Sequence, residues 1–231
     1  MAAQLSIIIP TLNAATQLPE TANALLEGIS TGLIKELIIS DGGSSDETEM
    51  IAKELGAIFI SGKKSRGGQI ARGVAAAKGD WLLILHADTH LSPDWMGAAQ
   101  VHMTHHGQDA GWFRLRFRAE GIMAKLVAGG ANIRSKRLGL PYGDQGLLVA
   151  RAVLERVGSV PELPLMEDVE LACRLKGRLR RLEAYADTSA EKYFSEGWIR
   201  RVARNLCTLA KYARGRDPEQ LAAGYDNNSK S

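Results

Sequence analysis

The sequence predicts an α/β protein with a mainly parallel sheet covered by helices on both faces. Two observations support this prediction. Four short apolar runs alternate with helical segments in the first 90 residues, and such alternation is typical of parallel sheets. The apolar runs also end in polar clusters, as expected where ligands bind beyond the carboxyl ends of the strands.

The first half supplies four strands and the helices between them. The strands are short runs rich in Ile or Leu and bounded by turn residues; they cover residues 5–10, 34–40, 57–61 and 81–88. Turn and capping residues set the helix limits. We expect helices over Thr16–Ser30, over Glu47–Leu55 with Asp46 as N-cap, and from the basic, glycine-rich loop Gly62–Gly68 to Lys78.

The second half is less regular and predicts a mixed arrangement. The segment "GWFRLRFR", residues 111–118, alternates apolar and basic residues and predicts a half-exposed antiparallel strand. Further strands are expected at 147–150 and 180–186. Helices are expected over 93–106, 121–137 and 151–158, within 163–178 and over 198–216, and the last residues, 225–231, are expected to form a disordered tail.

Composition limits the class of protein. The chain has 231 residues and a net charge of +3, too weakly basic to argue for nucleic acid as a partner. Its cysteines, Cys173 and Cys207, lack metal-ligand spacing and predict reduced thiols in a cytoplasmic protein. The N-terminus has no signal-peptide pattern. No apolar run approaches the roughly 20 residues that span a bilayer.

The fourth strand ends in His86-Ala87-Asp88. Residues two apart in a strand point to the same side, so His86 and Asp88 can reach one ion. A lone carboxylate suits Mg²⁺ or Mn²⁺ when substrate phosphates supply other ligands, and imidazole favours Mn²⁺. The alternative is that Asp88 caps the next element while His86 is a core histidine.

Two earlier strands also end in polar clusters. The loop after the third strand carries Lys63, Lys64, Arg66 and Arg72 among glycines, and such a loop before a helix suits a diphosphate. Asp41 ends the second strand and can accept the N–H of a nucleobase. The alternatives are a solvated basic loop and an aspartate that shapes a turn.

An adjacent acidic pair, Glu167 and Asp168, opens a helix after the apolar segment "LPLM". Carboxylates at a helix N-terminus are favoured by the helix dipole and by free N–H groups. Capping explains one acid of the pair but not two.

Residues 198–216 form a basic amphipathic helix. They carry no acidic residue, and one stripe is apolar. The plain interpretation packs this stripe on the domain and leaves the basic face in solvent. The alternative is a peripheral contact with anionic lipid. The stripe comprises Ile199, Val202, Leu206, Leu209 and Ala213, and the cations are Arg200, Arg201, Arg204, Lys211, Arg214 and Arg216.

Taken in order, these clusters resemble a known family. The segments "IIIPTLNAATQLPETANAL", "IISDGGSSDET", "LLILHADT", "YGDQGLLVAR" and "MEDVELACRLK", with the basic loop, look like a family 2 glycosyltransferase of the GT-A fold. The motifs "LHADT", "GDQG" and "EDVEL" resemble those of the small selenodomain-associated or arsenosugar-biosynthesis branch of the family. The resemblance covers residues 4–220.

The resemblance implies a role for each matching residue. Asp88 matches the metal-binding aspartate, with His86 in place of the usual first acid, and Asp168 matches the catalytic base, with Glu167 beside it. Asp144 and Gln145 fall where the family lines the sugar and acceptor pocket. The positions implied to bind the nucleotide are Pro10, Thr11, Leu12, Asn13, Asp41, Gly43, Ser44, Arg66 and Gln69.

The function implied is an inverting, Mn²⁺- or Mg²⁺-dependent transfer of sugar from a nucleotide-diphosphate sugar, usually UDP-linked, to an acceptor hydroxyl. The Gln-x-x-Arg-Trp motif of processive synthases is absent, and Arg200 or Arg201 is the candidate to replace its arginine. The alternatives are a catalytically silent nucleotide-sugar-binding scaffold at a membrane and a nucleotidyltransferase. One domain, 1–231, is expected, with a nucleotide-binding half (1–90), an acceptor-side half (91–195), a helix (196–220) and a tail (221–231).

Overall fold

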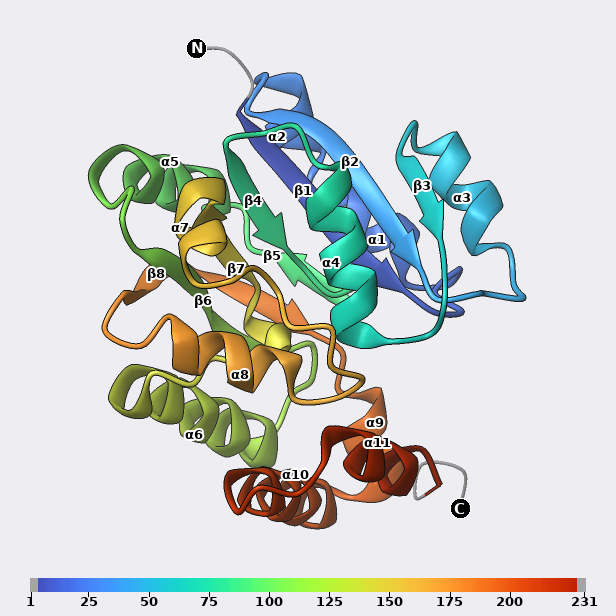
Figure 1. Ribbon diagram of the computed structural model, residues 1–231, viewed down its shortest axis with the longest axis vertical. Coiled ribbons are helices and arrows are strands. Elements are labelled where there is room, and N and C mark those ends of the chain that lie inside the picture. Colours follow the sequence, from blue (N-terminus) through green and yellow to red (C-terminus); the bar gives the residue numbers. More distant parts are fainter. Residues whose placement is uncertain (1–3, 228–231) are drawn as a thin grey trace.

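The chain folds around one large sheet (Figure 1). This computed structural model describes residues 4–227, with side chains through residue 224. The strands lie side by side in the order β3-β2-β1-β4-β7-β6-β8-β5. They are β1 (Leu5–Thr11), β2 (Ile34–Asp41), β3 (Ile58–Ser61), β4 (Trp81–Ile84), β5 (Thr89–Leu91), β6 (Ala110–Phe117), β7 (Leu147–Ala150) and β8 (Leu179–Thr188).

The first half of the sheet is parallel, as predicted. Strand β1 lies between β2 and β4, and β3 extends the sheet beyond β2, all in parallel register. The register pairs Thr11 with Asp41, so the carboxyl ends of β1 and β2 meet at one edge. Alternate side chains enter opposite layers of the core: Ile7 and Ile9 pack on one side and Ile8 on the other.

The second half of the sheet is mixed. Strand β7 runs antiparallel to both β4 and β6, whereas β8 runs parallel to β6 and antiparallel to β5. The prediction that "GWFRLRFR" is half-exposed holds for its second half, where Leu115 and Phe117 are buried and Arg116 is exposed, but not for residues 111–113, which are all buried. Phe113 packs in the layer that contains Trp95, while Leu115 and Phe117 pack under α6. The short edge strand β5 was not predicted.

Helices cover the sheet in layers (Figure 1). One core layer contains side chains of α1, α3 and α5, and the opposite layer contains those of α4, α7 and α8. The helices are α1 (Leu18–Asn23), α2 (Leu26–Ser30), α3 (Thr48–Glu54), α4 (Arg66–Ala76), α5 (Trp95–His105), α6 (Ile122–Leu138), α7 (Arg151–Arg156), α8 (Glu167–Arg174), α9 (Glu191–Glu196), α10 (Trp198–Ala213) and α11 (Pro218–Asn227), with a 3₁₀ turn η1 (Gly143–Gln145).

Three helical predictions need correction. The segment 16–30 forms two short helices, because the amide of Leu25 bonds to Ala22 in a tighter turn. Helix α3 begins at Thr48, whose amide and hydroxyl both donate to Asp46. Helix α4 begins at Arg66, inside the segment predicted as a loop. A β-carbon at Gly67 would lie 2.2 Å from the carbonyl oxygen of Pro161, so this helix start needs glycine.

The C-terminal segment differs most from prediction. Helix α9 was not expected, and residues 196–220 hold α10 and the start of α11 rather than one helix. Backbone 225–227 belongs to α11, which corrects the predicted tail for these residues; 228–231 lie outside the described residues. The orientation of α10 also differs from the plain interpretation, which packed the apolar stripe on the domain. Arg201 is buried, whereas Ile199 and Leu206 of the apolar stripe are exposed. Within residues 4–227, no helix is long and apolar enough to cross a bilayer.

Candidate active site

The carboxyl ends of β1 and β2 form a closed hydrogen-bond network around Asp41. Its carboxylate accepts from the Thr11 hydroxyl (2.9 Å), from the amides of Gly43 and Ser44 (both 2.7 Å) and from the Ser44 hydroxyl (2.5 Å). Burial raises the pKa of Asp41, but these hydrogen bonds outweigh burial and hold that pKa below its ordinary value. An ionised carboxylate has about four acceptor sites, so this one is fully used by the protein.

The loop after β1 is fastened to the same turn. The Asn13 amide donates to the Ser44 hydroxyl oxygen (2.8 Å), and the Asn13 side-chain carbonyl accepts from the Ser45 amide (2.9 Å). Asn13 has φ 51°, in the left-handed region that asparagine tolerates. Leu12 is exposed beside it at the edge of the sheet. The predicted nucleoside-binding residues of the two strands are therefore brought together.

Gln69 is buried in α4 and holds the strand ends together. Its amide nitrogen donates to the carbonyl oxygens of Thr11 (2.6 Å) and Ser40 (3.3 Å), and its carbonyl accepts from the Ser65 amide (3.3 Å). A β-carbon at Gly42 would lie 2.9 Å from the Gln69 side chain. These contacts give Gln69 a structural task at the nucleotide edge.

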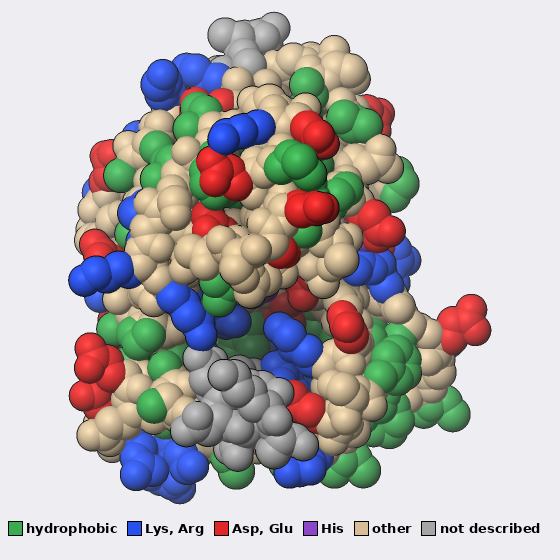
Figure 2. Space-filling view, turned by 90° about the vertical axis from the view of Figure 1, so that its right-hand side faces the viewer, with side chains coloured by type: hydrophobic (Ala, Val, Ile, Leu, Met, Phe, Trp, Pro, Cys, Tyr) green, Lys and Arg blue, Asp and Glu red, His purple; other side chains and the backbone are tan. Residues whose placement is uncertain are grey.

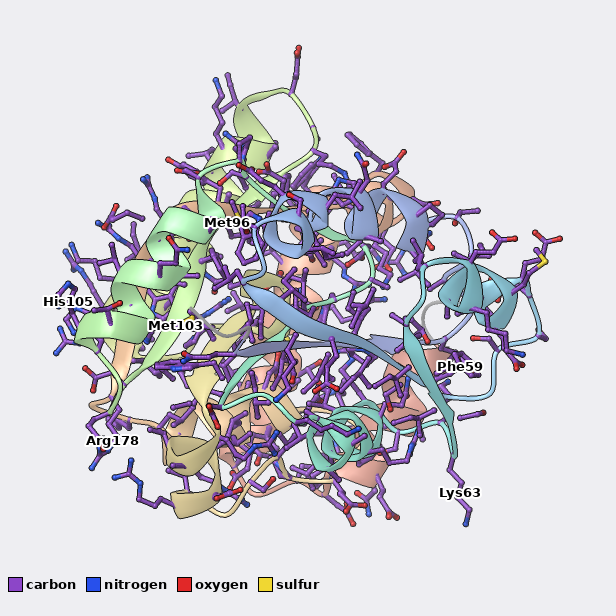
Figure 3. The ribbon with its side chains drawn as sticks, turned by 90° about the horizontal axis from the view of Figure 1, so that it is seen from above. Phe59, Lys63, Met96, Met103, His105 and Arg178 are labelled. Carbon is purple, nitrogen blue, oxygen red and sulfur yellow. The ribbon has the colours of Figure 1, made fainter. Side chains whose placement is uncertain are left out.

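The four cations predicted to bind a diphosphate separate in the structure. Arg72 donates to the carbonyl oxygens of Asp41 (3.0 Å) and Lys63 (3.3 Å), which ties α4 to the strand ends. The Lys63 side chain projects away from the sheet beyond β3 (Figure 3). Arg66 lines the central pocket. It is therefore the cation of this loop best placed for a ligand.

A pocket lies beyond β4, between the sheet, η1, the head of α8 and α9–α10. It offers ≈ 860 Å³ of space, its open mouth included. Lys and Arg side chains border a hollow in the lower half of the molecule (Figure 2). The polar residues lining the pocket include Arg66, His86, Asp88, Asp144, Asp168, Lys192, Arg201 and Asn205.

His86 and Asp88 both line this pocket. The predicted strand 81–88 ends at Ile84, so both residues lie in the turn between β4 and β5 and strand alternation does not place them. Burial and the charge of Arg66 lower the pKa of His86 to about 4, so the imidazole is neutral at pH 7. The ring lies against η1: a β-carbon at Gly143 would be 2.4 Å from His86 Nε2. The backbone of Asp88 is held by Arg118 and Ser189, which bond to its carbonyl oxygen, while its carboxylate borders the pocket.

Asp168 is fixed at the head of α8. Its carboxylate accepts from the amides of Gly143 (2.9 Å) and Val169 (2.8 Å). Met166, just before the helix, has φ 68° in the left-handed region, an unfavourable conformation for a residue with a side chain. Strain of this kind persists where the surroundings over-determine the backbone. The left-handed backbone of Met166 sets the direction in which the chain enters α8, and so the direction of Glu167 and Asp168.

The neighbouring Glu167 faces a different environment. It lines an adjoining apolar pocket that also contains Ile70, Val160 and Leu171, and it is absent from the lining of the open pocket. Burial and the charge of Asp168 raise the pKa of Glu167 to about 8, although Arg66 approaches to 3.7 Å. Asp168 is therefore the acid of the pair that meets the open pocket.

The two acceptor-side residues of η1 also separate. Asp144 lines the open pocket; its Oδ1 atom is buried without a hydrogen-bond partner, and burial raises its pKa to about 6. Gln145 does not line the pocket, which corrects that prediction. It is fully buried, and its amide bonds to the Ser135 hydroxyl (2.6 Å) and the Phe113 carbonyl oxygen (3.2 Å).

Sequence patterns missed the contribution of α9 and, apart from the candidate Arg200 or Arg201, that of α10. Lys192, Tyr193 and Asn205 line the pocket from these helices. Arg201 lines it as well and is 8% exposed, whereas Arg200 points to solvent. Arg201 pairs with Glu196 (2.6 Å), which also pairs with Arg204. The sequence signals of this basic wall were the absence of acids from 198–216 and the missing arginine motif, for which Arg200 or Arg201 was the candidate replacement.

The sequence of this chain matches a known protein family. Residues 6–135 match the model described as Glycosyl transferase family 2, and this match covers more than half of the 231 residues. The chain belongs to glycosyl transferase family 2. Its curved mixed sheet, flanked by helices, is the GT-A fold of that family's solved members.

Curated family 2 relatives match a limited segment. A PGL/p-HBAD biosynthesis glycosyltransferase of Mycobacterium bovis is 40% identical over 93 residues, which are 37% of this chain and 36% of the relative. A glucosyl-3-phosphoglycerate synthase of Mycolicibacterium smegmatis is 33% identical over 103 residues, 39% of this chain and 32% of the relative. The matches thus span about a third of each relative's length.

Solved structures share the fold over most of the chain. The fragment 1–349 of S. aureus TarS superposes with a TM-score of 0.63 at 18% identity, covering 95% of this chain and 69% of the fragment. Glucosyl-3-phosphoglycerate synthase from Mycobacterium tuberculosis, in complex with Mn²⁺ and UDP-glucose, gives 0.57 at 18% identity, covering 80% and 69%. TarS has also been solved with UDP-GlcNAc.

The pocket offers a divalent cation few ligands from the protein itself. Among residues 4–227, no three His, Cys, Asp or Glu side chains gather as a ready cluster for a metal. Asp88 and neutral His86 nevertheless border one pocket, and oxygen with imidazole suits Mn²⁺ or Mg²⁺ when a diphosphate completes the shell. The residues present fit an ion that binds together with its nucleotide.

Proposed function

We propose that this family 2 protein is an inverting glycosyltransferase that moves a sugar from a nucleotide-diphosphate sugar, a UDP-sugar in the first instance, to an acceptor hydroxyl. One observation carries the proposal: Asp88 and Asp168 border a single pocket together with Arg66, Lys192 and Arg201. One pocket thus contains a carboxylate that could bind a metal ion, a carboxylate that could accept a proton, and cations that could bind a diphosphate.

The nucleoside is proposed to lie along Pro10–Asn13 and Asp41–Ser44, where the ends of β1 and β2 meet. Because the Asp41 carboxylate is fully used, a base N–H can bind there only if the Ser44 hydroxyl rotates away. Asp88 would hold Mn²⁺ or Mg²⁺, with His86 orienting it or joining as a ligand. When bound, that ion supplies positive charge beside the leaving diphosphate.

The transfer is proposed to be a single displacement. The acceptor oxygen forms a bond to the anomeric carbon as the bond from that carbon to the diphosphate breaks, and the hydroxyl proton passes to Asp168. The Gly143 and Val169 amides, both bonded to the Asp168 carboxylate, orient it. Arg66, Lys192 and Arg201 stabilise the charge that develops on the departing diphosphate. Asp144, with its unpartnered Oδ1, is proposed to bind a sugar or acceptor hydroxyl.

The proposal extends to a cytoplasmic setting, with peripheral contact through 198–216 at the inner face of the membrane and a small-molecule or lipid acceptor. Assignment to the selenodomain-associated or arsenosugar-biosynthesis branch is proposed on the motifs "LHADT", "GDQG" and "EDVEL".

A thermal-shift panel of UDP-, GDP-, ADP- and dTDP-sugars, with and without Mn²⁺, tests the donor. Ligand stabilisation follows RT ln(1 + [L]/Kd), so one nucleotide should raise the melting temperature more with Mn²⁺ present. Slow release of free sugar from that donor separates an enzyme from a silent binder. A nucleotidyltransferase would instead release pyrophosphate from a nucleoside triphosphate and a sugar phosphate. No response across the panel contradicts the proposal.

A further inference from the structure

Exposed apolar side chains gather on α6, α9 and α10. Such side chains occur singly on most protein surfaces, but a contiguous group marks an interaction site. Ile122 and Ile199 are each 76% exposed, and Phe194 is 65% exposed. The outer face, as we call it, comprises Ile122, Met123, Leu126 and Ile133 of α6, Phe194 of α9, and Ile199 and Leu206 of α10.

The three helices form one layer. Helix α10 contacts both α6 and α9. Beneath them, Phe117 packs edge-on against Tyr193 and Trp198, and Tyr193 stacks on Trp198 with ring centroids 4.8 Å apart. Phe194 packs on the same Trp198 ring. This aromatic cluster joins α9 and α10, and the buried Ala124 and Ala128 of α6 pack in the same apolar core.

The amphipathic faces of α10 are partly reversed: Val202 and Leu209 of its apolar stripe are half-buried, and Arg200 and Lys211 remain exposed. The inward face of α10 carries Arg201 and Thr208, both 8% exposed, while Ile199 and Leu206 meet solvent. A surface helix ordinarily turns its apolar stripe to the core. The reversal keeps the polar face on the active-site pocket, which Arg201 and Thr208 line. The apolar face is then left for a partner.

The charge around this face selects the partner. Helices α6 and α10 contain no Asp or Glu, whereas α9 carries Glu191, which is exposed, and Glu196, which pairs with Arg201 and Arg204. The exposed cations of α6 and α10 outnumber these acids; they are Lys125, Lys136, Arg137, Arg200 and Lys211. A second copy docked through the same face would bring like charges together. An anionic bilayer instead offers an apolar interior to the side chains and phosphate groups to the cations.

We propose that the outer face of α6, α9 and α10 lies on an anionic phospholipid bilayer. This deepens the membrane contact in the proposed function and rests on that function for its biological sense. Binding to vesicles requires no catalysis, so the docking surface and the enzyme activity can fail independently. Docking here would place the helices that line the active site, through Lys192 and Arg201, between the bilayer and the pocket.

Vesicle flotation tests the proposal. The protein should float with vesicles of phosphatidylcholine mixed with phosphatidylglycerol and far less with phosphatidylcholine alone. Replacing Ile199→Ser and Leu206→Ser together should weaken partitioning about tenfold for each side chain removed. The matched control is Met50→Ser with Val101→Ser, because these residues are 50% and 57% exposed on α3 and α5. Thermal melting checks that both double variants fold.

A native cysteine reports whether α10 itself enters the lipid. Cys207 is exposed beside Leu206, so a polarity-sensitive fluorophore there, in a Cys173→Ser background, should shift to the blue on the anionic vesicles. Failure of the unmodified protein to float, equal losses in both double variants, or flotation without a blue shift would each overturn the proposal. So would a dimer, seen by light scattering, that dissociates only in the Ile199/Leu206 variant.

Discussion

The backbone amide of Gly143 donates to the Asp168 carboxylate across 2.9 Å, joining the turn η1 to the head of α8. The same glycine lies against the His86 ring at the end of β4. The end of β4, η1 and the first turn of α8, which are far apart in the sequence, are thus in contact at one point. The orientation of Asp168 depends on a turn that carries no catalytic side chain at this position.

Gly143→Ala should damage this contact. Its β-carbon would lie 2.4 Å from His86 Nε2, so the turn must shift and withdraw its amide from Asp168. We expect a loss of about 1–3 kcal/mol in the free energy of unfolding, with a fall in sugar transfer. His86→Ala makes room, so the double variant should be more stable than additivity predicts. Urea unfolding of the four proteins measures this coupling, and simple additivity would argue against the contact.

Asp168→Asn tests the proposed base. The variant keeps the shape of the side chain but cannot take a proton, so transfer should fall about 10²- to 10⁴-fold. Nucleotide binding, measured by calorimetry with Mn²⁺, should be little changed. The companion is Glu167→Gln, which alters an acid that faces the apolar pocket and should reduce transfer less. Equal losses in the two variants would assign the chemistry to the pair rather than to Asp168.

Asp88 and His86 should differ in their effect on metal dependence. Asp88→Asn is expected to abolish the part of donor-induced thermal stabilisation that requires Mn²⁺, because the pocket loses its proposed carboxylate ligand. His86→Ala should preserve that part if the imidazole only orients its surroundings. An equal loss in both variants would identify His86 as a direct ligand. The measurement is the melting temperature with donor over a Mn²⁺ titration.

Two adjacent arginines provide a matched pair. Arg201 lines the pocket, whereas Arg200 points to solvent from the same helix. Arg201→Gln should weaken binding of the nucleoside diphosphate about tenfold or more, since charge-assisted hydrogen bonds to the phosphates are lost. Arg200→Gln should bind the nucleotide normally. Calorimetric titration decides, and equal affinities would exclude Arg201 from the diphosphate site.

The sequence was informative where one periodicity or one strand end determines position. Alternating apolar residues such as Ile7 and Ile8 must enter opposite layers, and parallel strands must bring Thr11, Asp41 and Asp88 to one edge. Burial and convergence of these residues were therefore predictable. Their hydrogen bonds were not, because the four donors around Asp41 depend on turn geometry.

Prediction failed where local pattern leaves tertiary choices open. The pattern of α10 shows which residues share a face, but the direction of that face depends on the pocket that Arg201 lines. Gln69 and Gln145 matched motif positions, yet both bond to backbone carbonyls inside the protein. The short strand β5 gives no periodic signal, since three residues pair with a distant β8.

Glu167 should make stability depend on pH. Its pKa is raised from 4.5 to about 8, so the folded protein keeps a proton that the unfolded chain has released between these values. The free energy of unfolding should fall as pH rises through this window, by on the order of a few kcal/mol. Glu167→Gln cannot ionise and should remove the Glu167 part of this fall, leaving the smaller part that the raised pKa of Asp144 contributes. Urea unfolding without nucleotide at about pH 5 and about pH 8 checks it. Parallel pH dependence in both proteins would mean that Glu167 is ionised in the folded state, with Arg66 compensating its charge.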